Sequence, residues 1–294
     1  MAEKDLSEKL LEDHGDVFAD LINVLIFQGE RLLKEEDILD GPTASQYKDA
    51  GERLREHVRD VVKYDKRQTT MAVFGIENQS QVDHDMVFRV MGYDYSSYRR
   101  QMDLGEQRHP VFTLVLNFGM KQWDGPKDVI SALDPTHPYA KYYSTAVSNP
   151  AIYVVDVAFL SKEIREKFTS DFRIIAEYFS AVREHREEEL RYNRQAMRHV
   201  EEVLDFFRVF SRDRRFEECK PVILREAKKG AVNMCTVMDY AEKQGKIEGK
   251  IEGKREQALE TAMEMIRAGE GPDKIRRYTK LSEEKIRELQ KGIG

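Results

Sequence analysis

The chain has 294 residues and a formal net charge of −6 at pH 7, from 48 Lys and Arg against 54 Asp and Glu. Its length predicts two domains, or one domain with an extension, and allows a substantial buried core. The acidic total excludes a protein that coats nucleic acid non-specifically, although it does not exclude a local basic groove. Hydrophobic residues make up 40% of the chain, which excludes global disorder.

The composition also bears on the compartment. The chain has two cysteines, Cys219 and Cys235, which are too few for a disulfide framework or a zinc cluster. Its first residues lack the apolar segment of a signal peptide. No stretch approaches the roughly 20 apolar residues of a membrane span. We therefore expect a cytoplasmic protein without a membrane partner.

The first predicted element is a helix over residues 16–34, where apolar residues recur at helical spacing and a second face carries Asp16, Asp20 and Asn23. Residues 38–52 contain glycine, proline and serine and predict a loop. Strands are predicted at 57–64 and 70–79, with a polar hairpin turn between them.

A helix over 85–102 comes next, followed by nearly continuous apolar runs at 111–119 and 151–160. Such runs are typical of strands buried on both faces. Residues 120–149 between them predict irregular structure. After residue 161 the chain becomes highly charged and helical, over 162–189, 193–210 and 218–243. This order predicts an α/β or α+β core with a helical C-terminal half.

The tail contains an internal repeat, with glycine at 245, 249 and 253 and glutamate every four residues from 248 to 264. Glycine costs about 1 kcal/mol per helix position, and a like-charge ladder is mildly destabilising. The repeat therefore predicts a frayed or partner-dependent helix. Two short helices over 272–290 have the spacing of a helix-turn-helix.

The charge of this tail leaves its role open. Residues 246–291 hold 12 basic and 10 acidic residues, whereas a DNA-reading module usually has a clearer basic face. Arg276 and Arg277 are candidates for contact with DNA phosphate. The same helices are also candidates for assembling a homo-oligomer, which we favour slightly.

The most informative constellation is Asp60 together with the run Glu77-Asn78-Gln79. Side chains alternate along a strand, so Glu77 and Gln79 share a face while Asn78 points the other way. In the predicted hairpin, Asp60 lies on the neighbouring strand and can point at Glu77. Two close carboxylates repel each other unless a cation lies between them, and Mg²⁺ prefers such oxygen ligands.

These residues and their surroundings resemble the PD-(D/E)XK nuclease superfamily. More narrowly, they resemble the family of recombination-promoting nucleases (Rpn) and PD-(D/E)XK transposases. The resemblance covers about residues 10–190, and the most specific stretch is FGIENQSQVDHDMVFRVMGYD. It implies an α/β, restriction-endonuclease-like core with a mixed central sheet flanked by helices. It also implies a DNA endonuclease that requires Mg²⁺ or another divalent ion such as Mn²⁺ or Ca²⁺.

The resemblance also assigns roles to residues. Asp60 and Glu77 become metal ligands and catalytic residues, with the backbone carbonyl of Asn78 as a third ligand. Gln79 becomes catalytic in the place of the usual motif lysine, a departure from the superfamily pattern. Asp16 or Asp20 corresponds to an acidic position that supports the metal.

Two further basic residues are candidates for contact with DNA. Lys63 is a candidate to supply the charge that Gln79 lacks, although three residues along a strand place it on the opposite face from Asp60. Arg89, on the helix after the motif, is a candidate for contact with phosphate, although a solvated helix face is the alternative.

These expectations define a nuclease-like domain over 1–190, a helical region over 191–243, and a Gly-rich linker helix with a helix-turn-helix-like tail over 244–294. The expected function is metal-dependent hydrolysis of DNA phosphodiesters, linked to recombination, transposition or defence. One alternative is a DNA-binding or oligomerising protein with a degenerate nuclease core, since the motif lysine is missing. Another is an assembly factor driven by the helical tail.

Overall fold

The computed structural model describes residues 9–41, 44–48, 54–58, 60–65, 72–105, 107–211 and 213–293. The chain divides into two compact units, Met1–Val237 and Met238–Gly294. The finer three-part division expected from the sequence stays a prediction. Among the described residues, no helix combines the length and the apolar character needed to cross a membrane.

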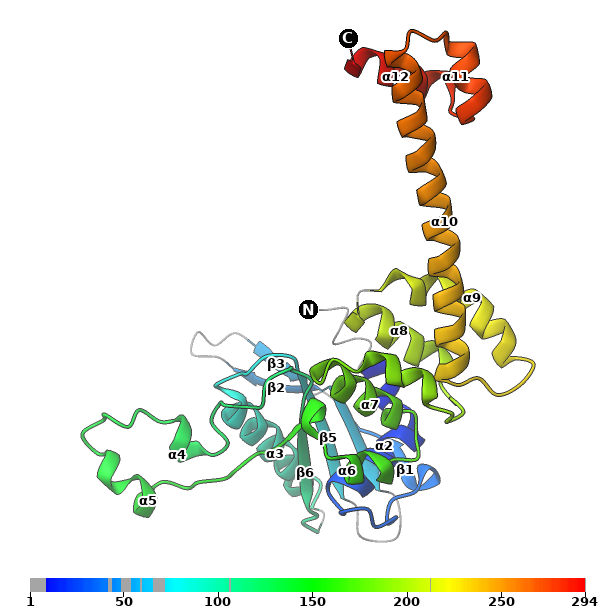
Figure 1. Ribbon diagram of the computed structural model, residues 1–294. Helices are drawn as coiled ribbons and strands as arrows, with labels where there is room; N and C mark the ends of the chain where they lie inside the picture. Colours follow the sequence, from blue (N-terminus) through cyan, green and yellow to red (C-terminus); the bar gives the residue numbers. More distant parts are fainter. Residues whose placement is uncertain are drawn as a thin grey trace. The chain divides into compact units, whose positions relative to one another are not determined.

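The first unit is built on a five-stranded mixed sheet, which makes it an α/β fold as predicted (Figure 1). The strand order is β1 (Ile38–Asp40), β4 (Val61–Asp65), β5 (Val73–Gln79), β6 (Val111–Asn117) and β7 (Tyr153–Asp156). The pairs β1–β4 and β4–β5 are antiparallel, and the pairs β5–β6 and β6–β7 are parallel. The strands β2 (Ala44–Lys48) and β3 (Leu54–Val58) form a separate antiparallel pair.

Helices cover both faces of the sheet (Figure 1). On one face, Met86, Val87 and Val90 of α3 (Met86–Asp103) pack with Val115 of β6 in one apolar cluster. The other face carries α2 (Gly15–Leu25) and α7 (Phe172–Arg183), where Phe18 of α2 meets Phe74 of β5 edge to face. Because side chains alternate along β5, its odd-numbered residues face α3 and its even-numbered residues face α2.

Further helices complete the first unit. They are α4 (Val129–Ala132), α5 (Tyr143–Ala146), α6 (Lys162–Lys167), α8 (Val200–Ser211) and α9 (Arg214–Ala227), with 3-10 turns at Glu35–Asp37, Ala140–Tyr142, Val157–Phe159 and Glu187–Tyr192. An aromatic cluster joins the end of β6 to α7 and α8, through Phe118, Phe172, Phe179, Phe206 and Phe210. Through this cluster, α8 packs against the C-terminal end of β6.

Several expected boundaries differ from the structure. The first helix ends at Leu25 rather than 34, because Gln28 and Gly29 adopt positive φ angles of 56° and 100° that a right-handed helix cannot continue. The expected loop at 38–52 contains β1 and β2. The expected strand at 57–64 is divided between β3 and β4, and the strand at 151–160 is only four residues long before a 3-10 turn.

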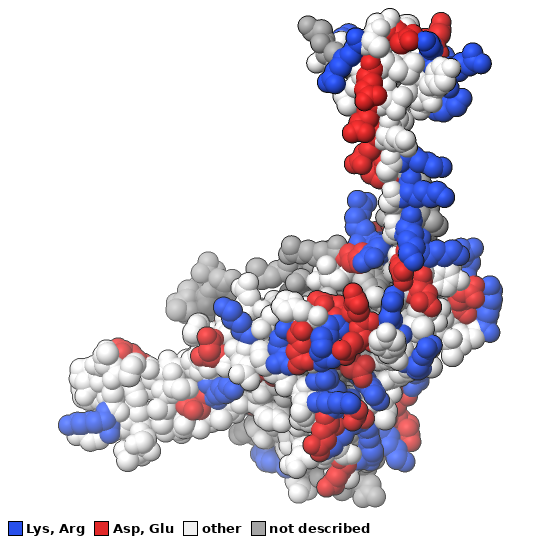
Figure 2. Space-filling view, viewed as in Figure 1, with Lys and Arg blue, Asp and Glu red and all other residues white. Residues whose placement is uncertain are grey.

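The second unit contains the remainder of the 34-residue helix α10 (Met234–Arg267), with α11 (Pro272–Thr279) and α12 (Glu283–Ile293). Ala262, Ile275 and Ile286 form its small buried core. Helix α10 passes without interruption through the glycine repeat. Acidic and basic side chains gather on different sides of this helix (Figure 2). The two short helices predicted for the tail are confirmed.

Candidate functional site

Asp60 lies directly before β4, at the end of the hairpin that the sequence predicts. The antiparallel register pairs Val61 with Ile76, so Asp60 occupies the position beside Glu77. Its Oδ2 accepts a hydrogen bond of 2.7 Å from the backbone N–H of Asn78, and its Oδ1 lies 2.7 Å from Lys9 Nζ. The fold therefore brings Asp60 to the same end of β5 as the Glu-Asn-Gln run.

Glu77 points to the face that α3 covers and is 1% exposed. Its Oε2 lies 3.1 Å from Arg89 Nη2, and Arg89 Nη1 donates to Asp83 Oδ2 at 2.9 Å. Burial and the charge of Glu77 both raise the pKa of Tyr93, whose hydroxyl accepts from Arg89. Burial alone would raise the pKa of Asp83, but hydrogen bonds from Arg89 and the Asp85 N–H outweigh it and lower that pKa. Arg89 is thus a counterion for a buried carboxylate.

The side chain of Asn78 points to the opposite face, where it meets the N-terminal segment. Its Nδ2 donates to Glu12 Oε2 at 2.7 Å, and Glu12 is 1% exposed. Burial raises the pKa of Glu12 to about 8, against the hydrogen bond from Asn78 and together with the repulsion from Asp60. Glu12 is therefore a buried carboxyl group close to Asp60 whose environment favours the neutral form.

The sequence prediction misses Glu12 because the first helix was expected to begin at residue 16. Residues 9–12 are helical, and a break at Asp13 and His14 separates them from α2. Glu12, Asp16 and Asp20 follow one another at intervals of four residues.

A groove with a volume of about 430 Å³ opens at this end of β5. It is lined by Asp60, Asn78, Gln79, Arg89 and the turn over residues 80–84. Gln79 is partly exposed and lies on the same face as Glu77, while its backbone carbonyl accepts a hydrogen bond of 2.7 Å from the N–H of Phe118. Its side chain is therefore placed to contact a molecule in the groove.

The backbone of Asn78 is oriented toward Asp60. The N–H and C=O of one strand residue point to the same side, and the next residue points to the other. The Gln79 carbonyl accepts from the Phe118 N–H on the β6 side of β5, whereas the Asn78 N–H donates to Asp60 on the β4 side. The Asn78 carbonyl is consequently directed to the side of β5 where Asp60 lies.

The oxygens around Asp60 fit a hard divalent cation. Glu12 Oε1 and Asn78 Oδ1 are buried, and neither has a hydrogen-bond partner among the described residues. Leaving a buried polar atom unsatisfied costs about 1–3 kcal/mol. These two oxygens lie on the α2 face of β5, whereas the Glu77 carboxylate lies on the α3 face. Carboxylate and amide oxygens suit Mg²⁺, Mn²⁺ or Ca²⁺ better than a metal that prefers thiolates.

Asp16 does not join this group in the structure. Its Oδ1 lies 2.8 Å from His199 Nε2, and its Oδ2 lies 3.2 Å from Arg198 Nη1. Both of its oxygens are therefore engaged by the two residues that directly precede α8.

Asp20 is also engaged elsewhere, and it is 3% exposed. Its Oδ2 accepts hydrogen bonds from the backbone N–H groups of Thr169 and Ser170 at 2.8 and 2.7 Å, and Arg31 pairs with its Oδ1. These contacts tie α2 to the segment before α7. These contacts satisfy the buried Asp20 carboxylate and give it a structural role that requires no metal ion.

Lys63 lies on the α2 face, away from Asp60, as the strand alternation predicts. It is 3% exposed, and its Nζ donates to Asp13 Oδ1 and Asp40 Oδ1 at 2.5 and 2.6 Å. A buried ammonium held by two carboxylates does not face a surface that DNA can contact. The structure therefore does not place Lys63 as a substitute for the missing motif lysine.

Arg276 and Arg277 lie on α11 in the second unit. They line a surface depression together with Lys280, Asp273 and Glu283. Arg276 Nη1 lies 3.1 Å from Glu283 Oε1. The surface around these arginines is thus of mixed charge, in line with the near-neutral composition of the tail.

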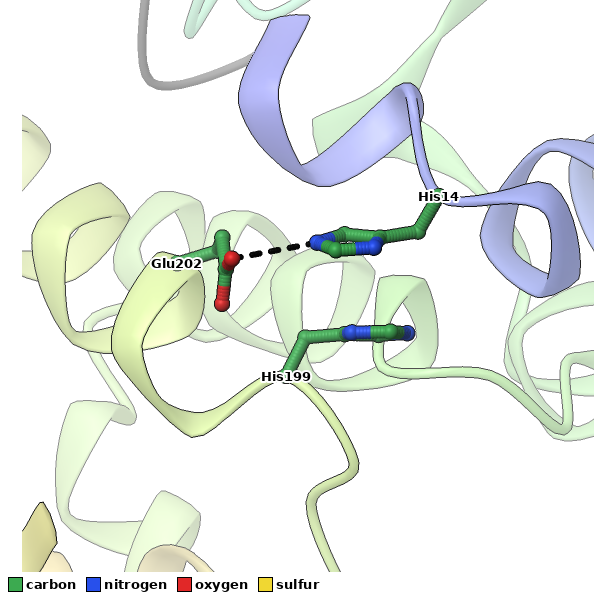
Figure 3. A group of neighbouring side chains, drawn as sticks. All are labelled: His14, His199 and Glu202. Carbon is green, nitrogen blue, oxygen red and sulfur yellow. Dashed lines mark hydrogen bonds and ion pairs between the residues drawn. The ribbon is translucent and has the colours of Figure 1, made fainter.

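A second cluster of ligand-type side chains lies elsewhere in the first unit. His14, His199 and Glu202 each offer one potential ligand atom, and these atoms lie within 4.8 Å of one another (Figure 3). Two imidazoles and a carboxylate can bind a metal ion. This donor set differs in chemistry from the oxygens around Asp60.

Comparison with protein-family models matches residues 45–206 to the family described as "Putative transposase, YhgA-like". The match covers more than half of the 294 residues and includes Asp60 and the run from Glu77 to Gln79. A search of curated proteins and a search of solved structures found no match. The chain belongs to the YhgA-like transposase family, which is the Rpn and PD-(D/E)XK-type transposase family that its motifs predict.

Proposed function

We propose that this protein is a divalent-metal-dependent DNA endonuclease with a restriction-endonuclease-like core. The observation that supports the proposal is the register of β4 and β5, which sets Asp60 beside Glu77 and bonds it to the Asn78 N–H, next to an open groove lined by Asp60, Asn78 and Gln79. Membership of a transposase family supports DNA as the substrate. It also supports a role in DNA rearrangement or defence.

The charges around the groove favour a bound cation during the reaction. Asp60 is paired with Lys9, whereas Glu77 and Asp83 share the single cation Arg89. A DNA phosphate entering such a groove meets a net negative charge. A divalent cation reverses this balance, which allows the phosphodiester to approach the carboxylates.

In this proposal, Asp60, Glu77 and the Asn78 carbonyl hold the ion, and Glu12 supports it in place of Asp16 or Asp20. When bound, a divalent ion lowers the pKa of a coordinated water and offsets charge on the phosphate. Gln79 orients the attacking water or a phosphate oxygen through its amide. Arg89, whose side chain is 36% exposed, contacts a phosphate on the groove side.

The test is cleavage of supercoiled plasmid by the purified protein in Mg²⁺, Mn²⁺ or Ca²⁺, with EDTA as the control. We expect nicked or linear product with at least one of these ions and none with EDTA. Asp60→Ala and Glu77→Ala should both abolish the product. Cleavage that persists in both variants would place the site elsewhere.

A second candidate is a DNA-binding protein with a degenerate nuclease core. Two observations favour it. Gln79 supplies no charge where the superfamily has lysine, and Lys63 is held away from the groove by Asp13 and Asp40. This candidate predicts that plasmid is retained but not cut with any ion, and that Asp60→Ala leaves retention unchanged. In both cases we propose that the C-terminal helices assemble a homo-oligomer.

A further inference from the structure

His14 and His199 are stacked face to face, with ring centroids 3.6 Å apart and an angle of 18° between the planes (Figure 3). His14 directly precedes α2, whereas His199 directly precedes α8 and Glu202 lies in the first turn of α8. The cluster thus joins the N-terminal segment to a helix that follows the sheet. His14 and Glu202 are 188 positions apart in the sequence.

The pair formed by His14 and Glu202 has the spacing of two ligands on one ion. His14 Nε2 lies 3.1 Å from Glu202 Oε1. In a tetrahedral zinc site with bonds of about 2.0–2.1 Å, two ligand atoms lie roughly 3.3 Å apart. An ion could therefore enter between these two atoms with little movement of the backbone.

The carboxylate of Asp16 orients the His199 ring as a third ligand. Asp16 Oδ1 lies 2.8 Å from His199 Nε2, and Arg198 holds the other oxygen of Asp16 at 3.2 Å. An anionic acceptor at Nε2 keeps the proton on that nitrogen, which leaves the lone pair on Nδ1. No described group is hydrogen-bonded to His199 Nδ1. Carboxylate–histidine pairs of this kind orient and strengthen metal-binding imidazoles.

We propose that His14 Nε2, His199 Nδ1 and the Glu202 carboxylate form a site for a borderline transition-metal ion, with Zn²⁺ as the representative. Imidazole ligands select Zn²⁺ over Mg²⁺, so the site is distinct from the oxygen site at Asp60. The three ligands are half-buried, which leaves the fourth position to water. Binding requires one ring to rotate out of the stack about χ2, a torsion with a broad energy well.

The bound ion cross-links the N-terminal segment to α8. Because His14 lies two residues after Glu12, the cross-link also restricts the movement of the segment whose Glu12 accepts a hydrogen bond from Asn78. This consequence for Glu12 rests on the proposed nuclease function, whereas the zinc site itself does not. Zinc binding can therefore be tested without any cleavage assay.

The experiment is calorimetric titration of the EDTA-treated, gel-filtered full-length protein with Zn²⁺ in excess Mg²⁺, together with thermal melting. We expect one Zn²⁺ per chain and a higher melting temperature on binding. His199→Gln and the isosteric Glu202→Gln should each weaken binding at least about tenfold and remove the thermal shift. His137→Gln, at an exposed histidine, is the matched control and should bind as the wild type does.

Asp60→Asn separates this proposal from the nuclease proposal. It should bind Zn²⁺ normally even if it has lost all cleavage. If His199→Gln does not fold by circular dichroism, Glu202→Gln decides, because it keeps the size and hydrogen bonding of the side chain. The proposal is overturned if the wild type binds no stoichiometric Zn²⁺, or if the folded ligand variants bind it with wild-type affinity.

Discussion

The side-chain amide of Asn78 donates a hydrogen bond of 2.7 Å to Glu12, which joins the motif strand to a segment 66 positions earlier in the sequence. The backbone N–H of the same asparagine holds Asp60 at 2.7 Å. Asn78 therefore connects two acids that the sequence separates widely. Asn78 stands between Glu77 and Gln79, the two positions that carry the family motif. Its side chain and its backbone both make contacts at the candidate site.

The first prediction concerns the pH dependence of stability. The folded pKa of Glu12 is raised to about 8, above its ordinary value of 4.5. Its stabilising contribution is therefore present below about pH 4.5 and is lost as the pH rises toward 8. In EDTA, wild type should lose on the order of a few kcal/mol of stability between pH 5 and pH 8 through this group.

Glu12→Gln should remove this loss, because a neutral amide has no proton to release. The measurement is the free energy of unfolding by urea at several pH values. Glu163→Gln, at an exposed glutamate on α6, is the control and should keep the wild-type pH profile. A Glu12→Gln profile that falls as steeply as the wild-type profile would contradict the burial argument.

The second prediction separates Asp20 from the metal site. Asp20→Ala leaves the N–H groups of Thr169 and Ser170 without their acceptor and should cost roughly 2–4 kcal/mol of stability. Asp20→Asn should recover part of this, because its carbonyl can still accept. Metal-dependent cleavage by the folded fraction should persist in both variants. Loss of cleavage in a fully folded Asp20→Asn protein would contradict this prediction and support a role for Asp20 in metal binding.

Much of the fold could be predicted because periodicity and apolar runs determine it locally. The β4–β5 hairpin, α3 and β6 lie where the alternation and the helical spacing indicate. The helix over 16–34 was too long because positive φ angles at Gln28 and Gly29 are a property of the turn, not of hydrophobic spacing. The length of β7 was wrong because a buried 3-10 turn is as apolar as a strand.

The candidate site was only partly predictable. The run Glu77-Asn78-Gln79 is local, and the hairpin places Asp60 beside it by register. Glu12 and the pairing of Arg89 with Glu77 depend on tertiary packing, which no local pattern encodes. The acidic stripe on the first helix led to Asp16 and Asp20 because sequence spacing cannot show which acids already have backbone or histidine partners.

The third prediction concerns the position of the missing motif lysine. Gln79→Ala should lower the cleavage rate roughly 10- to 100-fold, because the amide that orients water or phosphate is removed. The melting temperature should hardly change, since the Gln79 side chain is partly exposed at the groove. Gln81→Ala, at a neighbouring groove residue, is the matched control. Equal rates for wild type and Gln79→Ala would exclude a catalytic role for Gln79.

The fourth prediction concerns the tail. If α11 and α12 assemble the protein, the double substitution Arg276→Ala and Arg277→Ala should leave the salt dependence of plasmid binding unchanged. If these arginines bind phosphate, the slope of log affinity against log salt should become shallower by about one for each phosphate that is no longer neutralised. Binding isotherms at several salt concentrations measure this slope. A shallower slope would replace our assembly proposal with a tail that binds DNA.

The central claim is that Asp60 and Glu77 act together in metal-dependent cleavage, and one comparison of rates tests it most directly. The isosteric variants Asp60→Asn and Glu77→Gln are assayed on supercoiled plasmid in Mg²⁺ and Mn²⁺, with Asp103→Asn and Glu163→Gln at exposed positions as controls. We predict that both site variants lose at least about 100-fold in rate while folded, and that both controls cleave as the wild type does. Wild-type rates in the folded site variants would contradict the account.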